Sequence, residues 1–285
     1  MTTTTEFMDI SKQVSDKIKI PSISDVFIPH AKGNRTIKKA SNFGAIFLED
    51  GSVGVMYLNL EKSIKKTLER LNLNELRGEN PITLSQKFTS EDMAEKALGL
   101  GAINAISQYI FKKSKFKLDY TSDSVGLLNL NSRDVVGMVG FFPPLVTEIV
   151  QMGLRLIVVE KKKEFVSKSA RWEVTLNPEL LSKCTKVLIT STTIINDTID
   201  DIMENCFQAE HISVIGPTGG FFPDPLFKRG VDVVGGTQVV DHFRFKELMR
   251  QNRRWGSSTK KYCITKNNYP GFKSILESAQ KKQIF

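Results

Sequence analysis

The chain has 285 residues, of which 40% are hydrophobic and 25% charged; this is the composition of an ordinary globular protein and enough length for two domains. Its apolar stretches fall far short of the roughly 20 residues that cross a bilayer, and the start lacks the features of a signal peptide, so we expect a cytoplasmic protein without membrane segments. The formal net charge of +9 favours anionic partners, and the three scattered cysteines indicate neither a disulfide framework nor a thiolate zinc site.

Residues 1–115 predict an N-terminal α+β domain. Apolar residues from Phe7 to Ile18 recur at helical spacing, and a capping-box pattern at Thr89-Ser-Glu-Asp92 predicts the start of a helix that reaches about Lys112. Pro81 breaks the pattern before it. The other expected elements are a strand at 26–28, a hairpin of strands 44–48 and 53–58 around Glu49-Asp-Gly51, and a helix at 61–77.

Small residues fill the middle of the predicted helix, at Gly99-Leu-Gly-Ala-Ile-Asn-Ala105. Residues of this size allow another backbone, or a ligand, to come close. Asn104 is polar among apolar neighbours, so it either donates a hydrogen bond to a nearby loop or contacts a ligand.

From residue 116 onward, strand and helix patterns alternate after a polar connection. This alternation predicts a Rossmann-like α/β domain over 116–285, with a parallel sheet covered by helices on both faces and a basic C-terminal tail. The expected strands are 135–139, 154–159, 186–191, 211–215 and 231–234, and the expected helices are 143–152, 178–183, 197–207, 223–229 and 241–252.

The stretch 135–160 has the layout of the first βαβ unit of such a sheet. An apolar strand ends at Gly140-Phe141-Phe142-Pro143, a helix follows, and a second apolar strand ends at Glu160. Glu160 lies 20 residues after Gly140, about where a ribose-binding carboxylate is expected. The glycine pattern is incomplete and prolines lack N–H donors, which makes the turn a poor phosphate site. The alternative is a plain strand–helix connection followed by a solvated charged loop.

Three further segments follow predicted strands, where parallel strands open onto one crevice. Their hydroxyls, amides and acids suit a ligand, but the same residues also serve as helix caps and turn formers. For Asp241 the alternatives are a helix cap and a metal or acid–base role beside His242. The candidates are Thr192, Thr193 and Asn196, then Gly216 and Pro217, and finally Asp241.

Seven Lys and Arg residues lie within 244–261. No known nucleic-acid motif accompanies this charge, so a solvated basic face or a rim that attracts an anionic ligand is favoured over nucleic-acid binding.

Together these segments resemble the putative heavy-metal chelation family, in which an enolase N-terminal-like domain precedes a Rossmann-like domain. The resemblance covers most of residues 40–242 and implies a site in the cleft between the two domains, a homodimer, and a role in metal chelation. It departs from the family at Lys161-Lys-Lys163, where a shorter turn is expected. The positions carried over are Asn104, Gly140, Phe142, Pro143, Glu160, Thr193, Asn196, Gly216, Pro217 and Asp241.

Three functions therefore compete at this stage. The first is a small-molecule or metal-binding protein that uses Glu160 and Asp241 as oxygen ligands, which suit hard or borderline cations. The second is an enzyme with a nucleoside-type cofactor such as S-adenosylmethionine, in which Glu160 binds ribose hydroxyls and Phe141 or Phe142 packs on the base. The third is a basic nucleic-acid-binding module, whose binding would weaken steeply with salt.

Overall fold

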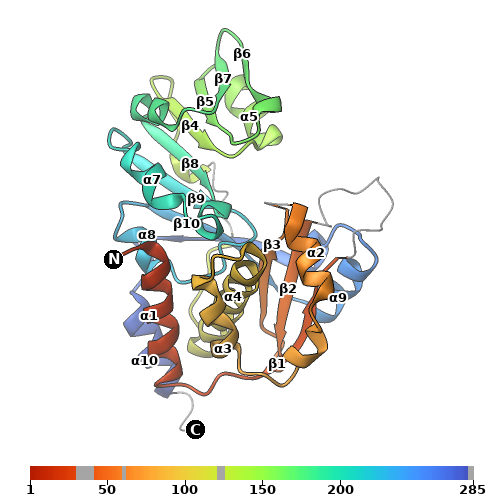
Figure 1. Ribbon diagram of the computed structural model, residues 1–285. Coiled ribbons are helices and arrows are strands. Elements are labelled where there is room, and N and C mark those ends of the chain that lie inside the picture. The colour runs from red at the N-terminus through yellow and green to blue at the C-terminus, as the bar shows by residue number, and fades with distance from the viewer. Residues whose placement is uncertain (30–41, 60–61, 121–125, 282–285) are drawn as a thin grey trace.

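The computed structural model describes residues 1–29, 42–59, 62–120 and 126–281, which form a small and a large β-sheet with helices between and around them (Figure 1). The small sheet comes from the N-terminal part, and the large sheet comes from the part after residue 126. The predictions on residues 30–41, 60–61, 121–125 and 282–285 lie outside the described residues.

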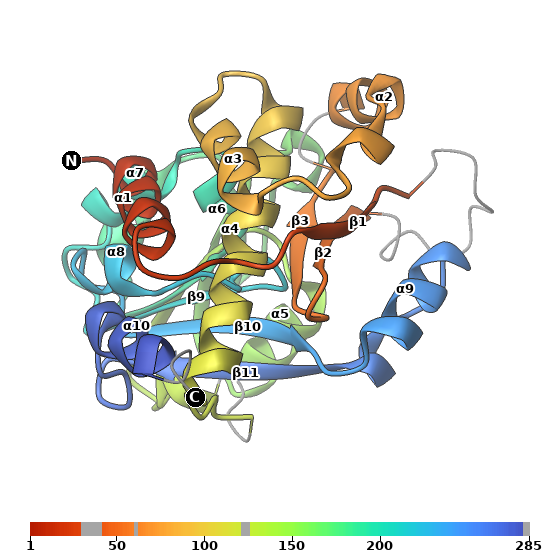
Figure 2. The same cartoon turned by 90° about the horizontal axis from the view of Figure 1, so that it is seen from below.

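The small sheet is an antiparallel meander of β1 (Ile23–Phe27), β2 (Phe43–Leu48) and β3 (Val53–Tyr57), in that spatial order. Its central strand is apolar on both sides, because successive side chains of a strand point to opposite faces. Ile46 packs toward the core that contains helix α4 (Met93–Ser114), whereas Ala45 and Phe47 pack toward helix α9 (His242–Arg250). The sheet thus lies between the two helices, as Figure 2 shows.

The large sheet has eight strands in the order β11-β10-β9-β8-β4-β5-β7-β6. The neighbours from β10 to β7 pair in parallel, and β11 and β6 pair antiparallel at the two edges. The bounds are β4 (Val135–Val139), β5 (Arg155–Val159), β6 (Ser167–Lys168), β7 (Trp172–Thr175), β8 (Lys186–Thr190), β9 (His211–Ile215), β10 (Val233–Val239) and β11 (Thr259–Thr265). The expected α/β class with a mostly parallel sheet is confirmed.

Helices cover both faces of the large sheet. On one face Met138 and Val158 pack with helix α5 (Pro143–Gln151), and on the other face the alternate side chains Ile157 and Ile189 join the larger core. That larger core includes residues of α1 (Thr3–Ser15), α4, α7 (Ile199–Glu204), α8 (Asp224–Phe227) and α10 (Phe272–Lys281). The remaining helices are α2 (Lys62–Arg70), α3 (Pro81–Ser85) and α6 (Thr192–Ile195).

The N-terminal helices agree with one local prediction and differ from another. The preceding helical pattern ends before Pro81, as predicted, and Pro81 also begins α3, where its missing N–H costs nothing and the Asn80 side chain caps the helix. Helix α4 starts at Met93 rather than at the predicted capping box, because the Asp92 carboxylate accepts hydrogen bonds from the N–H groups of Ala94 and Glu95.

The predicted basic C-terminal tail is instead ordered structure up to Lys281. Residues 259–265 form β11 at the edge of the large sheet, and α10 packs against α4. Helices α9 and α10 both pack on elements of the N-terminal part. The division into two domains, 1–115 and 116–285, therefore stays a prediction. Among the described residues, the helices include none with the length and apolar character needed to cross a membrane.

Candidate functional site

The chain order of the large sheet reverses at β4, because β5 lies on one side of it and β8 on the other. In open parallel sheets such a switch point leaves a crevice beyond the carboxyl ends of the strands. Gly140 follows β4 with φ +88°, and a Cβ added to it would lie 3.0 Å from Cγ2 of Thr190. The structure therefore brings the predicted Gly140 turn directly beside the end of β8.

The turn after Gly140 presents aromatic rings and few hydrogen-bond donors. Phe142 is the N-cap of α5 and makes no side-chain capping bond, and Pro143 occupies the first helical position. Phe141 and Phe142 are half-buried, and Phe141 lies 5.3 Å from the Phe165 ring between centroids. Because prolines lack N–H groups, this helix start suits an apolar or aromatic group better than a phosphate.

The Glu160 carboxylate lies next to this turn and accepts three backbone hydrogen bonds. Phe141 N donates to Oε2 at 3.1 Å, and the N–H groups of Lys161 and Lys162 donate to Oε1 at 2.8 and 3.2 Å. The Glu160 carboxylate thus holds the turn in place, as expected if this segment is a plain strand–helix connection. It is nevertheless half-buried, and Oε2, which accepts a single hydrogen bond, keeps acceptor capacity for a ligand, whereas Oε1 already accepts two.

Tyr57, at the end of β3, is a residue of this region that the sequence did not indicate. Burial raises the pKa of the Tyr57 hydroxyl, and the negative charge of Glu160 raises it further, against a hydrogen bond with Asn59. The small sheet lies near the carboxyl edge of the large one, because the Asn104 side chain donates to the carbonyls of both Val55 in β3 and Thr218 after β9. No local sequence pattern carries this proximity.

The hydroxyls at the end of β8 and just after it already have partners within the protein. Thr193 Oγ1 donates to the Thr190 carbonyl at 2.8 Å, and the hydroxyls of Thr190 and Thr192 lie 3.0 Å apart. Thr193 is buried, whereas Thr190 and Thr192 are half-buried. Thr192 therefore remains the more accessible of the two predicted threonines.

Asn104 and the loop after β9 form the third side of the region. The Asn104 Nδ2 group donates to the carbonyls of Val55 at 2.8 Å and Thr218 at 3.0 Å, while its buried Oδ1 has no partner. The amide thus links the small sheet to the loop that contains the predicted Gly216 and Pro217, which are half-buried. The expected hydrogen bond to a nearby loop is confirmed.

The Asn196 side chain is used locally, next to Thr192, and Asp241 lies apart from this group. Asn196 Oδ1 accepts from Thr198 Oγ1 at 2.5 Å, which is a local turn, and Asp241 caps α9 by accepting from Arg244 N at 2.9 Å. Asp241 follows β10 and Glu160 follows β5, four strand spacings apart, or about 19 Å at the usual ~4.8 Å between strands. The structure therefore separates the two carboxylates that the sequence assigned to one metal.

Thiolate and mixed metal sites also find little support. Burial raises the pKa values of Cys184 and Cys206 to about 12, which keeps both thiols protonated at neutral pH. Within the described ranges, no group of three or more His, Cys, Asp or Glu residues is placed to hold one metal ion.

Comparison with solved structures shows the same fold in two proteins of unknown function from the DUF364 family. The protein from Desulfitobacterium hafniense has a TM-score of 0.67 at 19% identity, with 91% of this chain and 98% of that chain covered. The protein from Pyrococcus horikoshii has a TM-score of 0.63 at 18% identity, with 91% and 99% covered.

The sequence comparisons agree with this likeness. An uncharacterized protein of Methanocaldococcus jannaschii is 28% identical over 172 residues, which are 60% of this chain and 63% of that relative, so the match leaves over a third of the relative unspanned. The family model described as putative heavy-metal chelation matches residues 123–267, from the connection before β4 to the end of β11. This match covers more than half of the chain, and the chain belongs to the DUF364 family.

Proposed function

We propose that this protein binds a small organic ligand in the crevice between the ends of β4 and β8, on the side that the small sheet approaches. The observation that carries the proposal is the position of Glu160, a half-buried carboxylate beside the Gly140 turn at the switch point of the sheet. The Thr192 hydroxyl and the rings of Phe141 and Phe142 supply the remaining chemistry.

These groups favour a ligand with hydroxyl donors and an apolar or aromatic part. Glu160 Oε2 can accept a hydrogen bond from one ligand hydroxyl, as an acid does from a ribose hydroxyl in dinucleotide sites, and the Phe141 and Phe142 rings offer a surface for packing. The proline pair disfavours a diphosphate at the helix start. A nucleoside-type molecule fits this set better than a free dinucleotide does.

The metal chelation in the family description fits the crevice less well. One carboxylate with hydroxyls is a small donor set for a protein-held metal, and Asp241 is too far away to complete it. The proposal therefore places an organic ligand first. A metal ion at Glu160 would require most of its donors from that ligand.

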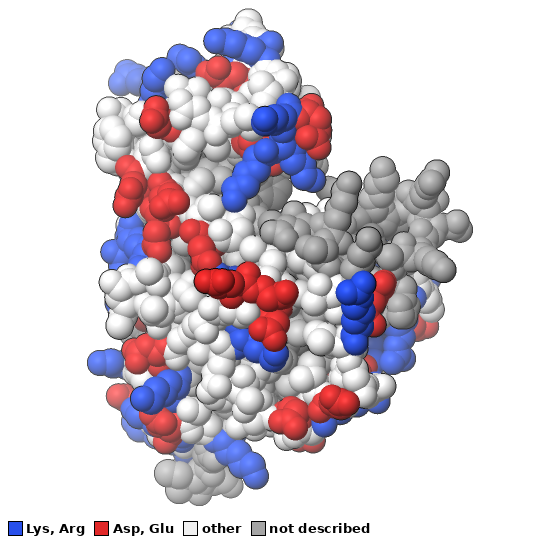
Figure 3. Space-filling model, in the orientation of Figure 1, with Lys and Arg blue, Asp and Glu red and all other residues white. Residues whose placement is uncertain are grey.

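Nucleic-acid binding has less support than binding of an organic ligand or of a metal ion. Within the basic segment 244–261, Lys246 and Arg250 lie 2.5 and 3.8 Å from the Asp25 carboxylate of β1, so part of that charge is used inside the molecule. Figure 3 shows acidic side chains among the basic ones on the face that it presents.

Isothermal titration calorimetry with adenosine as the probe tests the proposal, and Zn²⁺ alone serves as a separate probe. We expect adenosine to bind the wild type, and Glu160→Gln to weaken binding by roughly 10-fold or more, since a hydrogen bond to a charged group contributes about 1.5–3 kcal/mol. Thr192→Val leaves the Glu160 turn intact and should weaken binding less. Glu277→Gln, an equal loss of charge at an exposed position of α10, is the matched control and should bind as the wild type does.

Equal adenosine affinity in Glu160→Gln and the wild type would mean that the ligand does not bind in the crevice beside Glu160, and would contradict the proposal. Stoichiometric Zn²⁺ binding that Glu160→Gln abolishes, without any adenosine binding, would instead support chelation at this turn. Native mass spectrometry of the freshly purified protein adds an independent check, because a co-purified molecule identifies the ligand class directly.

A further inference from the structure

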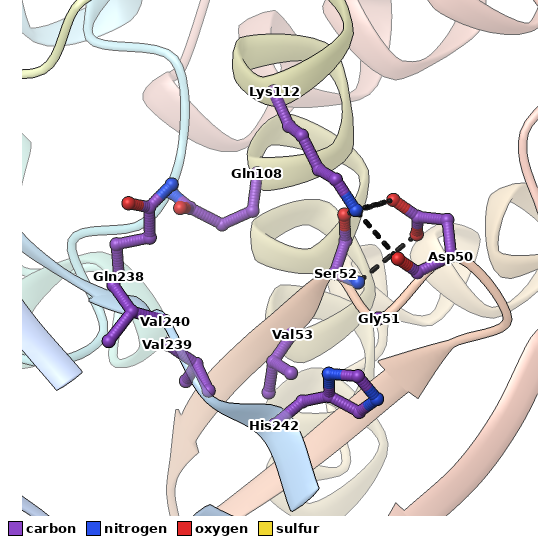
Figure 4. A pocket seen from close by; sticks show the side chains of 10 residues that line it. All are labelled: Asp50, Gly51, Ser52, Val53, Gln108, Lys112, Gln238, Val239, Val240 and His242. Atoms are coloured by element: carbon purple, nitrogen blue, oxygen red, sulfur yellow. Dashed lines mark hydrogen bonds and ion pairs between the residues drawn. The ribbon is translucent and has the colours of Figure 1, made fainter. Parts of the chain in front are cut away.

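A pocket lies where α4, the β2–β3 turn and the end of β10 meet. It has a volume of about 320 Å³, and Figure 4 shows its lining side chains. None of the residues discussed for the crevice lines it. The lining residues are Asp50, Gly51, Ser52, Val53, Gln108, Lys112, Gln238, Val239, Val240 and His242.

Gln108 lines this pocket and is 96% buried, its side-chain oxygen has no hydrogen-bond partner, and in Figure 4 that oxygen points toward Gln238. Its Nε2 group donates to the Gly220 carbonyl and to the Tyr262 hydroxyl, both at 2.9 Å. Rotating the amide by a half-turn would bring Oε1 against the Gly220 carbonyl oxygen, so these two contacts fix which end of the amide faces the pocket. A buried acceptor left without a donor is destabilising, and a bound donor would relieve that cost.

The charged groups of the pocket neutralise each other. Lys112 Nζ donates to the Asp50 carbonyl at 2.6 Å and to its Oδ2 at 3.1 Å, and the Ser52 hydroxyl donates to the same carboxylate at 2.8 Å. The ammonium keeps one N–H for a ligand, because it has three. The Lys112–Asp50 ion pair therefore favours binding of neither a free anion nor a free cation in the pocket.

The opposite wall adds a second amide and apolar surface. Gln238 Oε1 accepts from the Tyr120 hydroxyl at 2.5 Å, which leaves its NH₂ group as a donor. In Figure 4 the Gln108 and Gln238 side chains extend toward one another from α4 and β10. Val53 and Val239 line the pocket with apolar surface.

We propose that this pocket is a ligand site for a small, uncharged, planar molecule with an amide edge, such as a carboxamide or a lactam ring. The N–H of such a molecule donates to Gln108 Oε1, and its carbonyl accepts from Gln238 Nε2 or from the free N–H of Lys112. The flat faces pack on the valines. The volume lies at the lower end of the range of small-molecule sites, about 300–1,000 Å³.

The test compares two probes of nearly equal shape, benzamide and benzoate, in two-dimensional ¹H–¹⁵N NMR titrations of the whole chain. We expect benzamide to shift the backbone amide signals of Gly51, Ser52 and Val240 in a saturable way, and benzoate to bind at least roughly 10-fold more weakly, because it has no N–H for Gln108. No shift of these signals up to about 10 mM benzamide, or equal affinity for benzoate, would overturn the proposal.

Variants separate pocket occupancy from other effects. Gln108→Leu removes the acceptor, and Val240→Trp, at a half-exposed position, should close the mouth without disturbing the core and weaken benzamide at least roughly 10-fold. Phe243→Trp is the matched control, since this exposed residue lies three positions on and does not line the pocket. If Val240→Trp and Phe243→Trp bind benzamide equally, the ligand lies elsewhere and the proposal fails. This holds whether or not Gln108→Leu folds.

Discussion

The two faces of the small sheet are covered by α4 and α9, and the two contacts differ in kind. On the α4 face the backbones touch: a Cβ added to Gly54 in β3 would lie 2.0 Å from the Gly101 carbonyl oxygen. On the α9 face Phe47 and Phe245 lie 6.2 Å apart between centroids, and ion pairs to Asp25 close the edge. The α4 face therefore depends on close backbone packing. The α9 face combines aromatic packing with charge, so its contribution to stability should change with pH.

The largest effect is expected from Gly54→Ala. The added methyl overlaps the backbone of α4 at Gly101 and at Ala105, whose nitrogen lies 2.4 Å from the added Cβ, and neither atom belongs to a flexible side chain. We expect a loss of about 3 kcal/mol in the free energy of unfolding, measured by urea denaturation. Gly256→Ala is the control, because a Cβ there meets nothing within 4 Å. Similar stability of the two variants would mean that α4 does not approach β3 this closely.

The second-largest effect is expected from Asn104→Leu, because it breaks a buried polar link on the α4 face of the small sheet. The change removes the donor of the Val55 and Thr218 carbonyls, and we expect a loss of about 2 kcal/mol in the free energy of unfolding. Ser107→Ala removes a buried hydroxyl of the same helix that bonds only to the carbonyl one turn earlier, so it should cost less. Equal losses would show that the link between the sheet and the loop contributes little.

On the α9 face, Asp25→Asn should lower stability in a pH-dependent way. Burial opposes ionisation of Asp25, but its hydrogen bonds and charge interactions with Lys246 and Arg77 outweigh this and hold the carboxyl pKa below its ordinary value. The stabilisation is therefore complete above the unfolded pKa of about 4 and is lost as the pH falls through the lower folded value.

We expect Asp25→Asn to cost about 1.5 kcal/mol at pH 7, and its difference from the wild type to shrink toward pH 3, as followed by urea denaturation at several pH values. Asp16→Asn, an exposed change at the end of α1, should show no such trend. A difference that stays constant with pH would mean that the charge of Asp25 does not hold α9 on the sheet.

The sequence predicted the central strands of the large sheet well and its edges poorly. Strands 135–139 and 211–215 have the predicted bounds, because apolar runs bounded by polar residues leave little choice. Strand β11 was missed, since Lys260 and Lys261 are exposed at the sheet edge and hide the period of the strand. Helix α10 was missed because it lies inside what looked like a charged tail.

At the candidate sites, the sequence indicated single polar residues but not their partners. The small residues of α4 did signal close approach, and what approaches is the backbone of β3. Asn104 was noticed as a polar residue among apolar ones. Gln108, one turn on, has the same character, but it was not among the predicted site residues. The charge of Glu160 raises the pKa of Tyr57 only because of how the two sheets are placed, which no local pattern encodes.

The smallest effect is expected from Asp241→Ala, and it tests the separation of the two acids. Asp241 caps α9, so its loss should cost about 1 kcal/mol in the free energy of unfolding, whereas Asp241→Asn keeps a capping side chain and should cost less. Neither change should alter binding of adenosine or Zn²⁺ in calorimetry, because Asp241 lies four strands from Glu160 in the sheet. Loss of Zn²⁺ binding in both Asp241→Ala and Glu160→Gln would restore the shared metal site and contradict the separation, since two distant acids act independently unless one ion holds them both.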